Sequence, residues 1–462
     1  MSRLHALVLC AFAAPAFASI TSESESNDRE SRADGPVSPG ISVSGSLSTR
    51  RDVDWLWFDV PSAGRIDVRL DHASGRDFDW SLYAASGPAV ATGASSAIPE
   101  LGSYAAPAAG RYWLKLTAYS GSGSWQLDLG FVADGGGGGD GDPRPSPPGG
   151  LKRWLSGNAE DAGVEPQGGP GLLLMGGNFD IDEAFLQRAY PILNGGDIVV
   201  LRTAGSDGYN DYLYTLASGA LQPDSVETLL VDTRSKADSD YVAWAVRNAE
   251  LIYIAGGDQS DYLNQWQGTR LEEAIRQAFA RGAVVGGISA GLAVQGEHIY
   301  DPDGVSAVIS SEAIADPYRS SMLFSRDFLG LPLLAGVITD SHFAQRDRMG
   351  RLLAFMARLR EDGAAQRIVG LGIDEDTSLF VDRDGRSVVD GDFSVYVIEE
   401  TVDTQRVQVN PGQPLVYRNL RRIRLDAGQG YDFVSGTHDG SEISLSVDGR
   451  SSPALSPADP YR

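Results

Sequence analysis

The stretch "AVVGGISAGLAVQGE", residues 283–297, joins a short apolar run to a row of small residues that can open a helix. Within it, "GISAG" at 287–291 fits the pattern G-x-S-x-G, in which a serine sits on a sharp turn between a strand and a helix. Small neighbours suit this turn because the backbone folds tightly around the serine. Two interpretations follow: a nucleophile elbow carrying Ser289, or a glycine-rich loop that lets a helix pack close to a strand.

The surrounding sequence alternates apolar runs with helical patterns. The helical spacing is clear in "DYVAWAVRNAE" (240–250) and in "RLEEAIRQAFARG" (270–282), which ends on a glycine. This alternation predicts an α/β domain with a mostly parallel sheet covered by helices on both faces. The expected strands are 172–175, 197–201, 227–231, 251–255, 283–286 and 367–373.

Polar and glycine-rich segments follow these runs. They are "GGNFD" at 176–180, "AGSDGYND" at 204–211, "GGDQ" at 256–259 and the serine turn itself. Ligands of such sheets gather at the carboxyl ends of the strands, so we expect these segments to line one site.

Composition divides the chain into domains. Residues 134–150, "DGGGGGDGDPRPSPPGG", form a linker that has no means of building a core. Before it, residues 19–133 contain alternating apolar and polar runs with Gly/Ser turns, which predict a separate all-β sandwich. After it, residues 151–445 form the α/β domain, with β-hairpin patterns beyond Val381. Residues 446–462 are expected to be a Pro/Ser-rich tail.

The N-terminus has the features of a secretory signal peptide. Residues 1–18 combine Arg3, an apolar run and an A-x-A motif, so we expect cleavage after Ala18 and a secreted protein, extracellular or periplasmic. The single cysteine, Cys10, lies inside this leader, so no disulfide and no thiol nucleophile are expected. No later segment is long and apolar enough to suggest a membrane span. The net charge of −24 over 462 residues argues against nucleic acid and anionic membranes as partners.

A serine nucleophile needs a base and an acceptor that orients the base. His342 is favoured as the base because it follows an apolar run and precedes a helix, at the expected carboxyl end of a strand. Glu375 follows another strand and is a candidate acceptor, in competition with Asp374 and Asp376. The backbone N–H of Ala290 can face an oxyanion, and the "AGGDQ" loop, at Gly257 and Asp258, offers a second donor.

Three arginines gather after His342, near the start of the next helix. Arg346, Arg348 and Arg351 lie where the helix dipole is already positive, which is an unfavourable place for cations. Local rules are often broken at functional sites, so the cluster indicates a pocket for substrate carboxylates. The alternative is that the arginines pair with acidic surface residues of the protein.

The first domain resembles the prepeptidase C-terminal domain, a small sandwich appended to many secreted bacterial peptidases. The resemblance implies an accessory or adhesion role. Its aspartates either bind calcium or are solvated turn carboxylates. The matching residues are Glu23, Asn27, Asp28, Asp52, Asp54, Trp55, Leu82, Tyr83, Gly110, Arg111 and Tyr112.

Four blocks of the second domain resemble cyanophycinase, of the serine peptidase family that includes dipeptidase E. They are "GGDQ", "GGISAGLAV", "GVITDSHFAQRDRMGRL" and "GLGIDEDTSL", within about residues 165–400. The resemblance implies a class I glutamine-amidotransferase-like α/β fold, with Ser289 as nucleophile, His342 as base and an acid in the block of Glu375. Ser341 stands where cyanophycinases usually have glutamine, which affects the expected substrate fit. The residues matching the substrate pocket are Gln259, Asp340, Ser341, Arg346, Arg348 and Arg351.

Together these features predict a secreted serine exopeptidase. Its expected substrate is cyanophycin or a related β-linked aspartyl peptide, rich in Asp and Arg, and its expected products are β-Asp-Arg-type dipeptides. We expect no metal or organic cofactor, and a homodimer is an open possibility. The alternatives are an aspartyl dipeptidase and a non-catalytic binding protein that keeps the peptidase fold.

Overall fold

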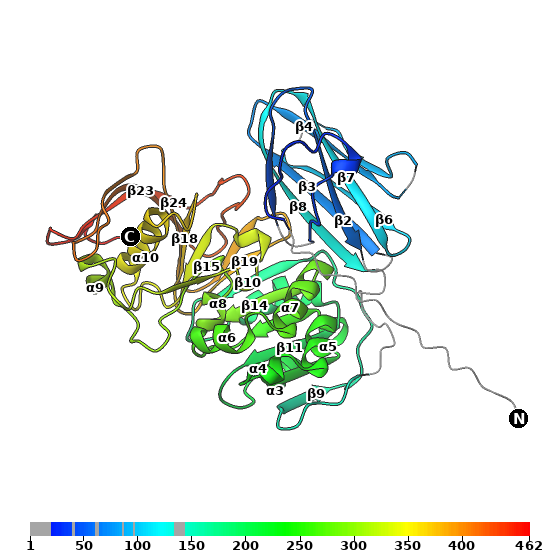
Figure 1. The fold of residues 1–462 in the computed structure, drawn as a ribbon. Helices are drawn as coiled ribbons and strands as arrows, with labels where there is room; N and C mark the ends of the chain where they lie inside the picture. The colour runs from blue at the N-terminus through cyan, green and yellow to red at the C-terminus, as the bar shows by residue number, and fades with distance from the viewer. Residues whose placement is uncertain (1–19, 39–41, 61–63, 86, 96–97, 134–143) are drawn as a thin grey trace, which may run out of the picture. The chain divides into compact units, whose positions relative to one another are not determined.

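A computed structural model describes residues 20–38, 42–60, 64–85, 87–95, 98–133 and 144–462. The expected signal peptide and most of the expected linker lie outside these residues. The chain forms two compact units, residues 1–136 and 137–462 (Figure 1). Each unit is described by itself.

The first unit is a β-sandwich, which confirms the expected fold. Its two antiparallel four-stranded sheets have the orders β1-β8-β3-β6 and β2-β7-β4-β5. Alternate residues face inward, so that Leu56, Phe58, Trp80 and Leu114 are buried in one apolar core. The elements are η1 (Glu30–Arg32), β1 (Val43–Leu47), β2 (Val53–Val60), β3 (Gly64–His72), β4 (Asp77–Tyr83), β5 (Ala91–Gly93), β6 (Glu100–Ala106), β7 (Gly110–Ser120) and β8 (Gly123–Ala133).

The second unit is built on an eight-stranded sheet with the order β20-β19-β10-β14-β13-β11-β12-β9. Its central strands β10, β14, β13, β11 and β12 are parallel, and antiparallel strands lie at both edges. The strands are β9 (Lys152–Gly157), β10 (Gly171–Met175), β11 (Asp197–Arg202), β12 (Ser225–Leu230), β13 (Leu251–Ile254), β14 (Val284–Ile288), β19 (Thr377–Val381) and β20 (Ser387–Gly391).

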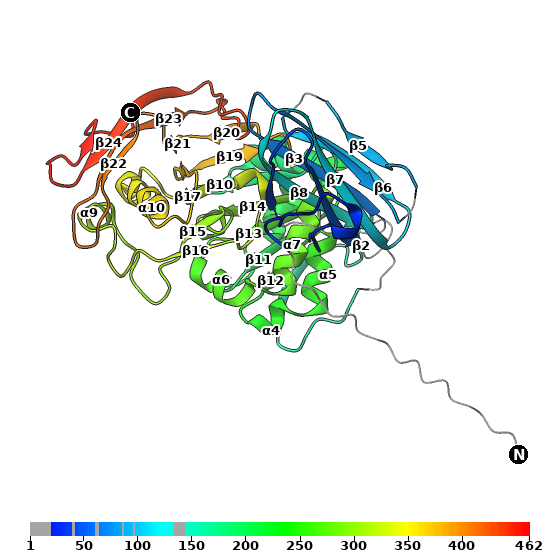
Figure 2. The ribbon, with the colours of Figure 1, turned by 45° about the horizontal axis from the view of Figure 1, so that its top comes forward.

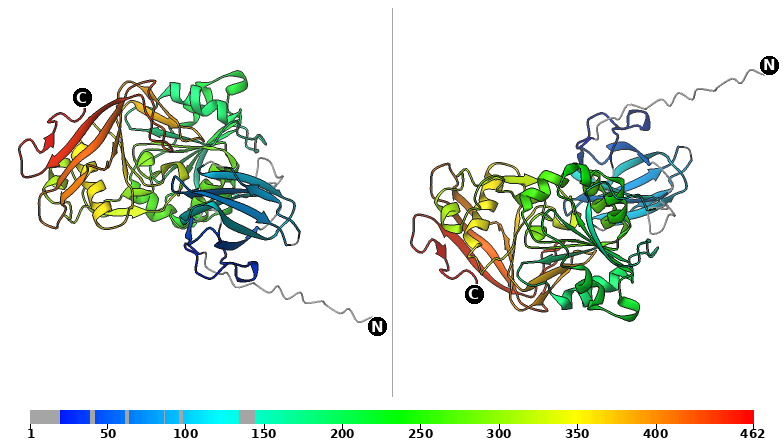
Figure 3. Two further views of the ribbon diagram at one scale, coloured as in Figure 1. Left: turned by 90° about the horizontal axis from the view of Figure 1, so that it is seen from above. Right: turned by 90° about the horizontal axis from the view of Figure 1, so that it is seen from below.

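Helices cover both faces of this sheet, as expected for strands that are apolar along their whole length (Figure 3). Leu172 and Leu174 of β10 pack with residues of α5, α6 and α7, whereas Leu173 and Met175 pack on the other face with η2 and α2. The helices are α1 (Asp182–Ala184), η2 (Phe185–Ala189), α2 (Tyr190–Leu193), α3 (Asn210–Leu216), η3 (Gly219–Leu221), α4 (Arg234–Ala237), α5 (Asp240–Asn248), α6 (Gln259–Trp266), α7 (Arg270–Arg281) and α8 (Ala290–Ala293).

A second, nine-stranded sheet of this unit has the order β16-β15-β17-β18-β21-β23-β24-β25, with β22 paired to β23. It contains the strand at 369–373, which the sequence placed in the main sheet. Helix α10 packs against β17 and β18 (Figure 2). The elements are β15 (His298–Tyr300), α9 (Ser310–Ala315), β16 (Phe324–Arg326), η4 (Pro332–Leu334), β17 (Val337–Asp340), α10 (Met349–Glu361), β18 (Val369–Ile373), β21 (Val395–Glu399), β22 (Gln405–Gln408), β23 (Val416–Leu425), β24 (Ser441–Asp448) and β25 (Leu455–Ser456).

The expected tail at 446–462 is instead part of this fold. Strand β24 runs to Asp448, and β25 pairs with it. Beyond β25, Tyr461 packs its ring edge-on against Phe343 and Tyr396. The Pro/Ser-rich composition hid this packing, because the segment contributes a single aromatic residue, the partly buried Tyr461, to the core.

Candidate active site

The elbow after β14 has the strained backbone that an exposed nucleophile needs. The backbone of Ser289 has φ 56° and ψ −110°, a combination that residues other than glycine rarely adopt. Glycines on each side make the turn possible. A methyl group on Gly287 would lie 2.7 Å from the backbone of Gly291, and one on Gly291 would lie 2.0 Å from the carbonyl oxygen of Ile254. Of the two interpretations of G-x-S-x-G, this geometry supports the nucleophile elbow.

Ser289, His342 and Glu375 form one hydrogen-bonded chain. The Oγ of Ser289 lies 2.7 Å from Nε2 of His342, and Nδ1 of His342 lies 2.6 Å from Oε1 of Glu375. This is the relation of nucleophile, base and orienting carboxylate that acyl transfer requires. Three segments that are far apart in the sequence therefore meet at one point.

Two backbone contacts hold the base in place. His342 follows β17, and its N–H donates to the carbonyl oxygen of Gly176 at 2.8 Å. A methyl group on Gly177 would lie 2.2 Å from Cε1 of His342, so the loop after β10 forms a wall against the imidazole ring. The sequence pointed to "GGNFD" as a site segment, but gave no sign that Gly177 packs on the base.

The structure brings Glu375 to His342, and neither of the two competing aspartates. Asp374 accepts hydrogen bonds from the N–H groups of Ala344 and Ser394. Asp376 accepts from the side chain of Asn178 and from the N–H of Phe179. Both carboxylates therefore brace loops around the site.

Gln345, which the sequence reasoning missed, steadies Glu375 itself. Its side-chain oxygen accepts the N–H of Glu375 at 3.0 Å. Gln345 lies in the same loop as His342, so this bond ties the acid's backbone to the loop that carries the base.

The surroundings of His342 favour its neutral form. Burial lowers the pKa of His342 below its usual value of 6.5, while the hydrogen bond that the ring donates to Glu375 raises it and the nearby Arg346 and Arg348 lower it again. With Nδ1 facing a carboxylate, the ring proton belongs on Nδ1. Nε2 is then free to accept the proton of Ser289.

The loop between β13 and α6 borders the nucleophile. A methyl group on Gly256 would lie 3.7 Å from Cβ of Ser289, so the chain passes close to the serine at this point. Gly257 and Asp258 follow and are both exposed, and the side chain of Asp258 caps α6 by accepting the N–H of Ser260. Ala290 follows Ser289 directly, as the first residue of α8.

The three arginines that the sequence assigned to a pocket for substrate carboxylates have different surroundings. Arg351 is buried, and its guanidinium donates to both oxygens of Asp340, at 2.7 and 2.6 Å, and to the carbonyl oxygen of Val308. The expected direct contacts of Arg351 and Asp340 with substrate are therefore not supported. The physical reason is that Arg351 lies inside α10, which packs back onto the end of β17.

Arg348 and Arg346 lie nearer the surface. Arg348 donates to Asp340 at 3.2 Å and to the carbonyl oxygen of the buried Ser341 at 2.8 Å, and burial lowers its pKa to about 10. Arg346 has a half-exposed side chain, and its Nε lies 3.9 Å from Oε1 of Glu375. The expected alternative was pairing with acidic surface residues, whereas Arg348 and Arg351 pair with Asp340, which is buried.

Gln259 and Tyr461 each form hydrogen bonds with other segments of this unit. Gln259, the first residue of α6, is half-buried and donates to the carbonyl oxygen of Tyr300. The hydroxyl of Tyr461 accepts the N–H of Met349 at 2.9 Å and lies 3.0 Å from Oδ1 of Asp347. Tyr461 thus caps α10 beside the loop of His342, Arg346 and Arg348, a role that the sequence did not reveal.

Comparison with known proteins agrees with this geometry. Residues 172–389 match the model of Peptidase family S51. A cyanophycinase of Trichormus variabilis is 33% identical over 217 residues, which cover 46% of this chain and 67% of that protein. The chain belongs to peptidase family S51. A cyanophycinase of Geminocystis herdmanii is 33% identical to this S51 peptidase over 198 residues, covering 42% of this chain and 66% of that one.

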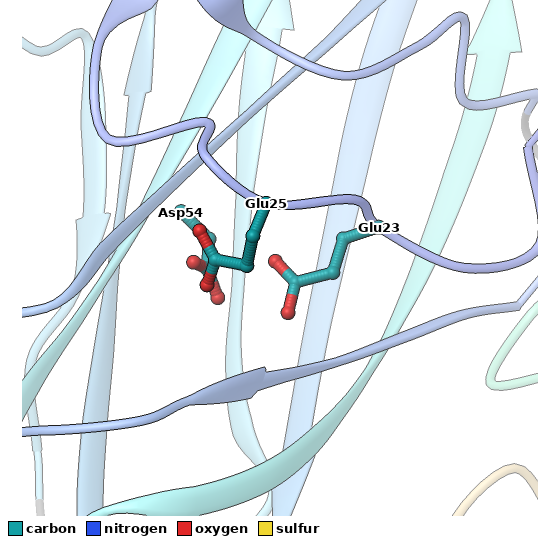
Figure 4. Close-up of side chains that lie close together, drawn as sticks. All are labelled: Glu23, Glu25 and Asp54. Carbon is teal, nitrogen blue, oxygen red and sulfur yellow. The ribbon is translucent and has the colours of Figure 1, made fainter.

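The first unit of this S51 peptidase matches a second model, the bacterial pre-peptidase C-terminal domain, over residues 52–118. In that unit, side-chain oxygens of Glu23, Glu25 and Asp54 lie within 4.8 Å of one another (Figure 4). Among solved structures, a peptidase from an acI-B1 actinobacterium is 18% identical with a TM-score of 0.39, covering 58% of this chain and 98% of its own. A putative peptidase E of Listeria monocytogenes is 17% identical with a TM-score of 0.31, covering 48% and 98%.

The two family models and the cyanophycinase relatives make the chain a cyanophycinase-like serine peptidase with an N-terminal pre-peptidase C-terminal domain. Among the residues that the structure describes, no helix is long and apolar enough to cross a membrane.

Proposed function

We propose that this protein is a secreted serine exopeptidase that hydrolyses cyanophycin, or related β-linked aspartyl peptides, to β-Asp-Arg-type dipeptides. The observation that carries the proposal is the chain from Ser289 through His342 to Glu375, in a family whose relatives include cyanophycinases. Secretion is supported by the leader-like residues 1–18 and by the bacterial pre-peptidase C-terminal domain.

In the proposed reaction, Ser289 Oγ attacks the carbonyl carbon of the scissile bond while Nε2 of His342 takes the hydroxyl proton. Glu375 holds the imidazole and stabilises the imidazolium that forms. The imidazolium then gives its proton to the leaving amine, and an acyl-enzyme ester remains on Ser289. Water, deprotonated by the same nitrogen, hydrolyses the ester and restores the serine.

The developing oxyanion needs donors on the side of the serine away from His342. The backbone N–H of Ala290 and the backbone at Gly257 and Asp258 are the proposed donors. Both segments are supported by their position beside Ser289 and by the glycines that allow the close approach. Fixed donors of this kind contribute about 2.7–4 kcal/mol each to transition-state stabilisation.

Substrate carboxylates would be held by Arg346 and Arg348, with Gln259 and Ser341 nearby. Arg346 is proposed as a contact because its side chain is half-exposed and lies beside Glu375. Arg348 is proposed because Asp340 and Ser341 fix its orientation with one of its terminal nitrogens. In this proposal, the buried Asp340 and Arg351 do not contact the substrate but hold Arg348 in position.

A narrower specificity, that of an aspartyl dipeptidase, is favoured by one feature. Ser341 stands where cyanophycinases usually have a glutamine, and its hydroxyl contacts Arg348 instead of extending outward. A shorter side chain here changes the contacts offered to a polymer backbone.

The direct test is to incubate the purified protein with insoluble cyanophycin and to identify the soluble products by mass spectrometry. We expect β-Asp-Arg dipeptides from the wild type and none from Ser289→Ala. Ser435→Ala, at an exposed serine remote in sequence from the triad, serves as the matched control and should behave like the wild type. An intact polymer together with rapid cleavage of short aspartyl peptides would favour the dipeptidase. No cleavage of either would contradict the proposal.

A further inference from the structure

Two exposed phenylalanines belong to loops that contact the segment of Glu375. The side chains of Phe179 and Phe393 have relative exposures of 71% and 48%. Among the described residues of the second unit, no other phenylalanine, tyrosine or tryptophan is exposed. Single exposed apolar residues are common on proteins, but two aromatic rings anchored at one segment beside the catalytic acid indicate a binding surface.

Asp376, the residue after Glu375, holds the loop of Phe179. The N–H of Asp376 donates to the carbonyl oxygen of Gly177 at 3.0 Å, and its Oδ1 accepts the N–H of Phe179 at 3.1 Å. Asn178 and Asp376 have φ angles of 66° and 53°, in the left-handed region that residues other than glycine adopt uncommonly. The loop is thus held in one conformation, and Phe179 follows two residues after the glycine that packs on the catalytic base.

The loop of Phe393 lies against the same residue. The carbonyl oxygen of Asp376 accepts the N–H of Asp392 at 2.9 Å. The N–H of Phe393 donates to Oγ1 of Thr377 at 3.2 Å. A methyl group on Gly391 would collide with the carbonyl oxygen of Asp376, so the two backbones are in direct contact. Both rings are therefore carried by backbone that is anchored beside the catalytic acid.

Two carboxylates of these loops have no cationic partner in the protein. Both oxygens of Asp376 lie within hydrogen-bond distance of Nδ2 of Asn178, which is a neutral donor. Asp392 is exposed and directly precedes Phe393. Within the residues that the structure describes, neither aspartate forms an ion pair, whereas the neighbouring Asp390 does. Carboxylates with only neutral donors, next to exposed rings, favour a cation as their ligand.

A different loop brings the opposite charge to Glu375. Arg346 follows β17, its side chain is half-exposed, and its Nε lies 3.9 Å from Oε1 of Glu375. Phe179 and Phe393 instead follow β10 and β20. The segment of the catalytic acid therefore borders a cation in one loop, and aromatic rings with carboxylates in two others. A ligand that carries both a carboxylate and a guanidinium group matches this separation of charge.

We propose that Phe179, Phe393, Asp376 and Asp392, here called the aromatic rim, bind the guanidinium group of an arginyl side chain of the substrate. A guanidinium lies flat on a π face and donates its N–H groups to carboxylates. An apolar side chain would use the rings but leave both carboxylates unpaired. The inference rests on the proposed function, because it assigns the arginine of a β-Asp-Arg unit to the aromatic rim and its carboxylates to Arg346.

Two matched substrates test the aromatic rim. They are short β-linked aspartyl peptides whose side chains end in arginine or in citrulline, which keeps the shape of arginine but is neutral. We expect kcat/KM of the wild type to be at least about tenfold higher for the arginine peptide, since each ring contributes about threefold to tenfold. Equal values for the two peptides would overturn the proposal.

Variants of the rings separate a π face from apolar bulk. Phe179→Tyr keeps the face and should keep the preference for arginine, whereas Phe179→Leu and Phe393→Leu should each lose about threefold to tenfold of it. Asp392→Asn should also weaken the preference. In all of them kcat/KM for the citrulline peptide should stay unchanged. Val402→Ala, at an exposed apolar residue in the turn after β21, is the matched control. A full preference in both leucine variants would show that the rings do not bind the guanidinium.

Binding to the inactive Ser289→Ala protein distinguishes this inference from the proposed function. Calorimetric titration measures the Kd of each peptide without turnover. Hydrolysis of both peptides with equal Kd values would leave the proposed function standing and overturn the aromatic rim. Selective binding of the arginine peptide that is lost when Phe179→Leu is added, without hydrolysis by the wild type, would support the rim and contradict the proposed function. If the rings join two copies of the chain, the leucine variants will change the sedimentation coefficient and not the preference, which would also overturn the proposal.

Discussion

The backbone at Gly177 lies directly against the imidazole of His342, so close that a methyl group there would lie 2.2 Å from Cε1. The loop after β10 therefore sets the position of a base that comes from the other sheet. Because the ring is held on one side by the backbone and on the other by Glu375, small changes in this loop should alter the chemistry more than the fold.

Gly177→Ala should lower kcat by at least about a hundredfold, since a displacement of the base by about 1 Å is enough for such a loss. The matched control is Gly168→Ala. Gly168 also has a positive φ, 78° against 134° at Gly177, but nothing lies within 4 Å of a methyl group added there. Both variants carry backbone strain, and only Gly177→Ala should lose activity out of proportion to its stability. Equal kcat values in the two variants would show that Gly177 does not set the position of His342.

The acid limb of the kcat/KM profile should have its midpoint below pH 6.5, because burial lowers the pKa of His342 and only the neutral ring can accept a proton. Activity should rise with pH through that midpoint.

Two substitutions should move this midpoint in opposite directions. Arg346→Ala removes a positive neighbour and should raise it, whereas Glu375→Gln removes the hydrogen bond that raises the pKa and should lower it. Glu375→Gln should also reduce kcat by about 10⁴-fold, as loss of an orienting acid does elsewhere. Shifts of the same sign in both variants, measured from rate against pH, would contradict this electrostatic account.

Arg346 and Arg351 should respond differently to substitution. Arg346→Ala should lower kcat/KM on aspartyl peptides roughly tenfold to a hundredfold with little change in stability, because a hydrogen bond to a charged group contributes about 1.5–3 kcal/mol. Lysine at this position should rescue only in part, since it lacks the bidentate fork.

Arg351→Ala should instead destabilise the peptidase unit by about 3–5 kcal/mol, because it removes the main partner of the buried Asp340. Adding Asp340→Asn to it should recover part of that loss. Measuring both the free energy of unfolding in denaturant and kcat/KM for each variant distinguishes a loss of substrate binding from a loss of stability. If Arg351→Ala were stable but had a much lower kcat/KM, Arg351 would have to contact the substrate.

Tyr461→Phe tests the contribution of the chain end to the site. The change keeps the ring packing on Phe343 but removes two hydrogen bonds, to Met349 and Asp347. We expect several-fold lower kcat/KM with a small change in melting temperature, because the loop carrying His342 and Arg348 loses its support. Tyr318→Phe, which removes one hydroxyl contact to Asp362, is the control and should leave kinetics unchanged. A purely structural role would lower stability in Tyr461→Phe and leave kcat/KM intact.

The sequence predicted the fold and the order of the site segments well, for physical reasons. Alternation of apolar runs and helical patterns is a local property, and so is the glycine spacing around Ser289. Local sequence patterns could not predict the contacts between segments that are distant in the sequence. The packing of Gly177 on His342, the cap by Tyr461 and the pairing of Arg351 with Asp340 depend on which strands become neighbours. The charge rule at the helix start flagged the arginines correctly as unusual, but it cannot tell which of them a buried acid already holds.

The central claim is that Ser289 is an activated nucleophile, and covalent labelling tests it most directly. The full chain is treated with a fluorophosphonate that phosphonylates activated serines, and the intact mass and tryptic peptides are measured. We predict one adduct per chain on the peptide containing Ser289, none in Ser289→Ala and strongly slowed labelling in His342→Ala. No adduct on the folded wild type, or an adduct that persists in Ser289→Ala, would contradict the account.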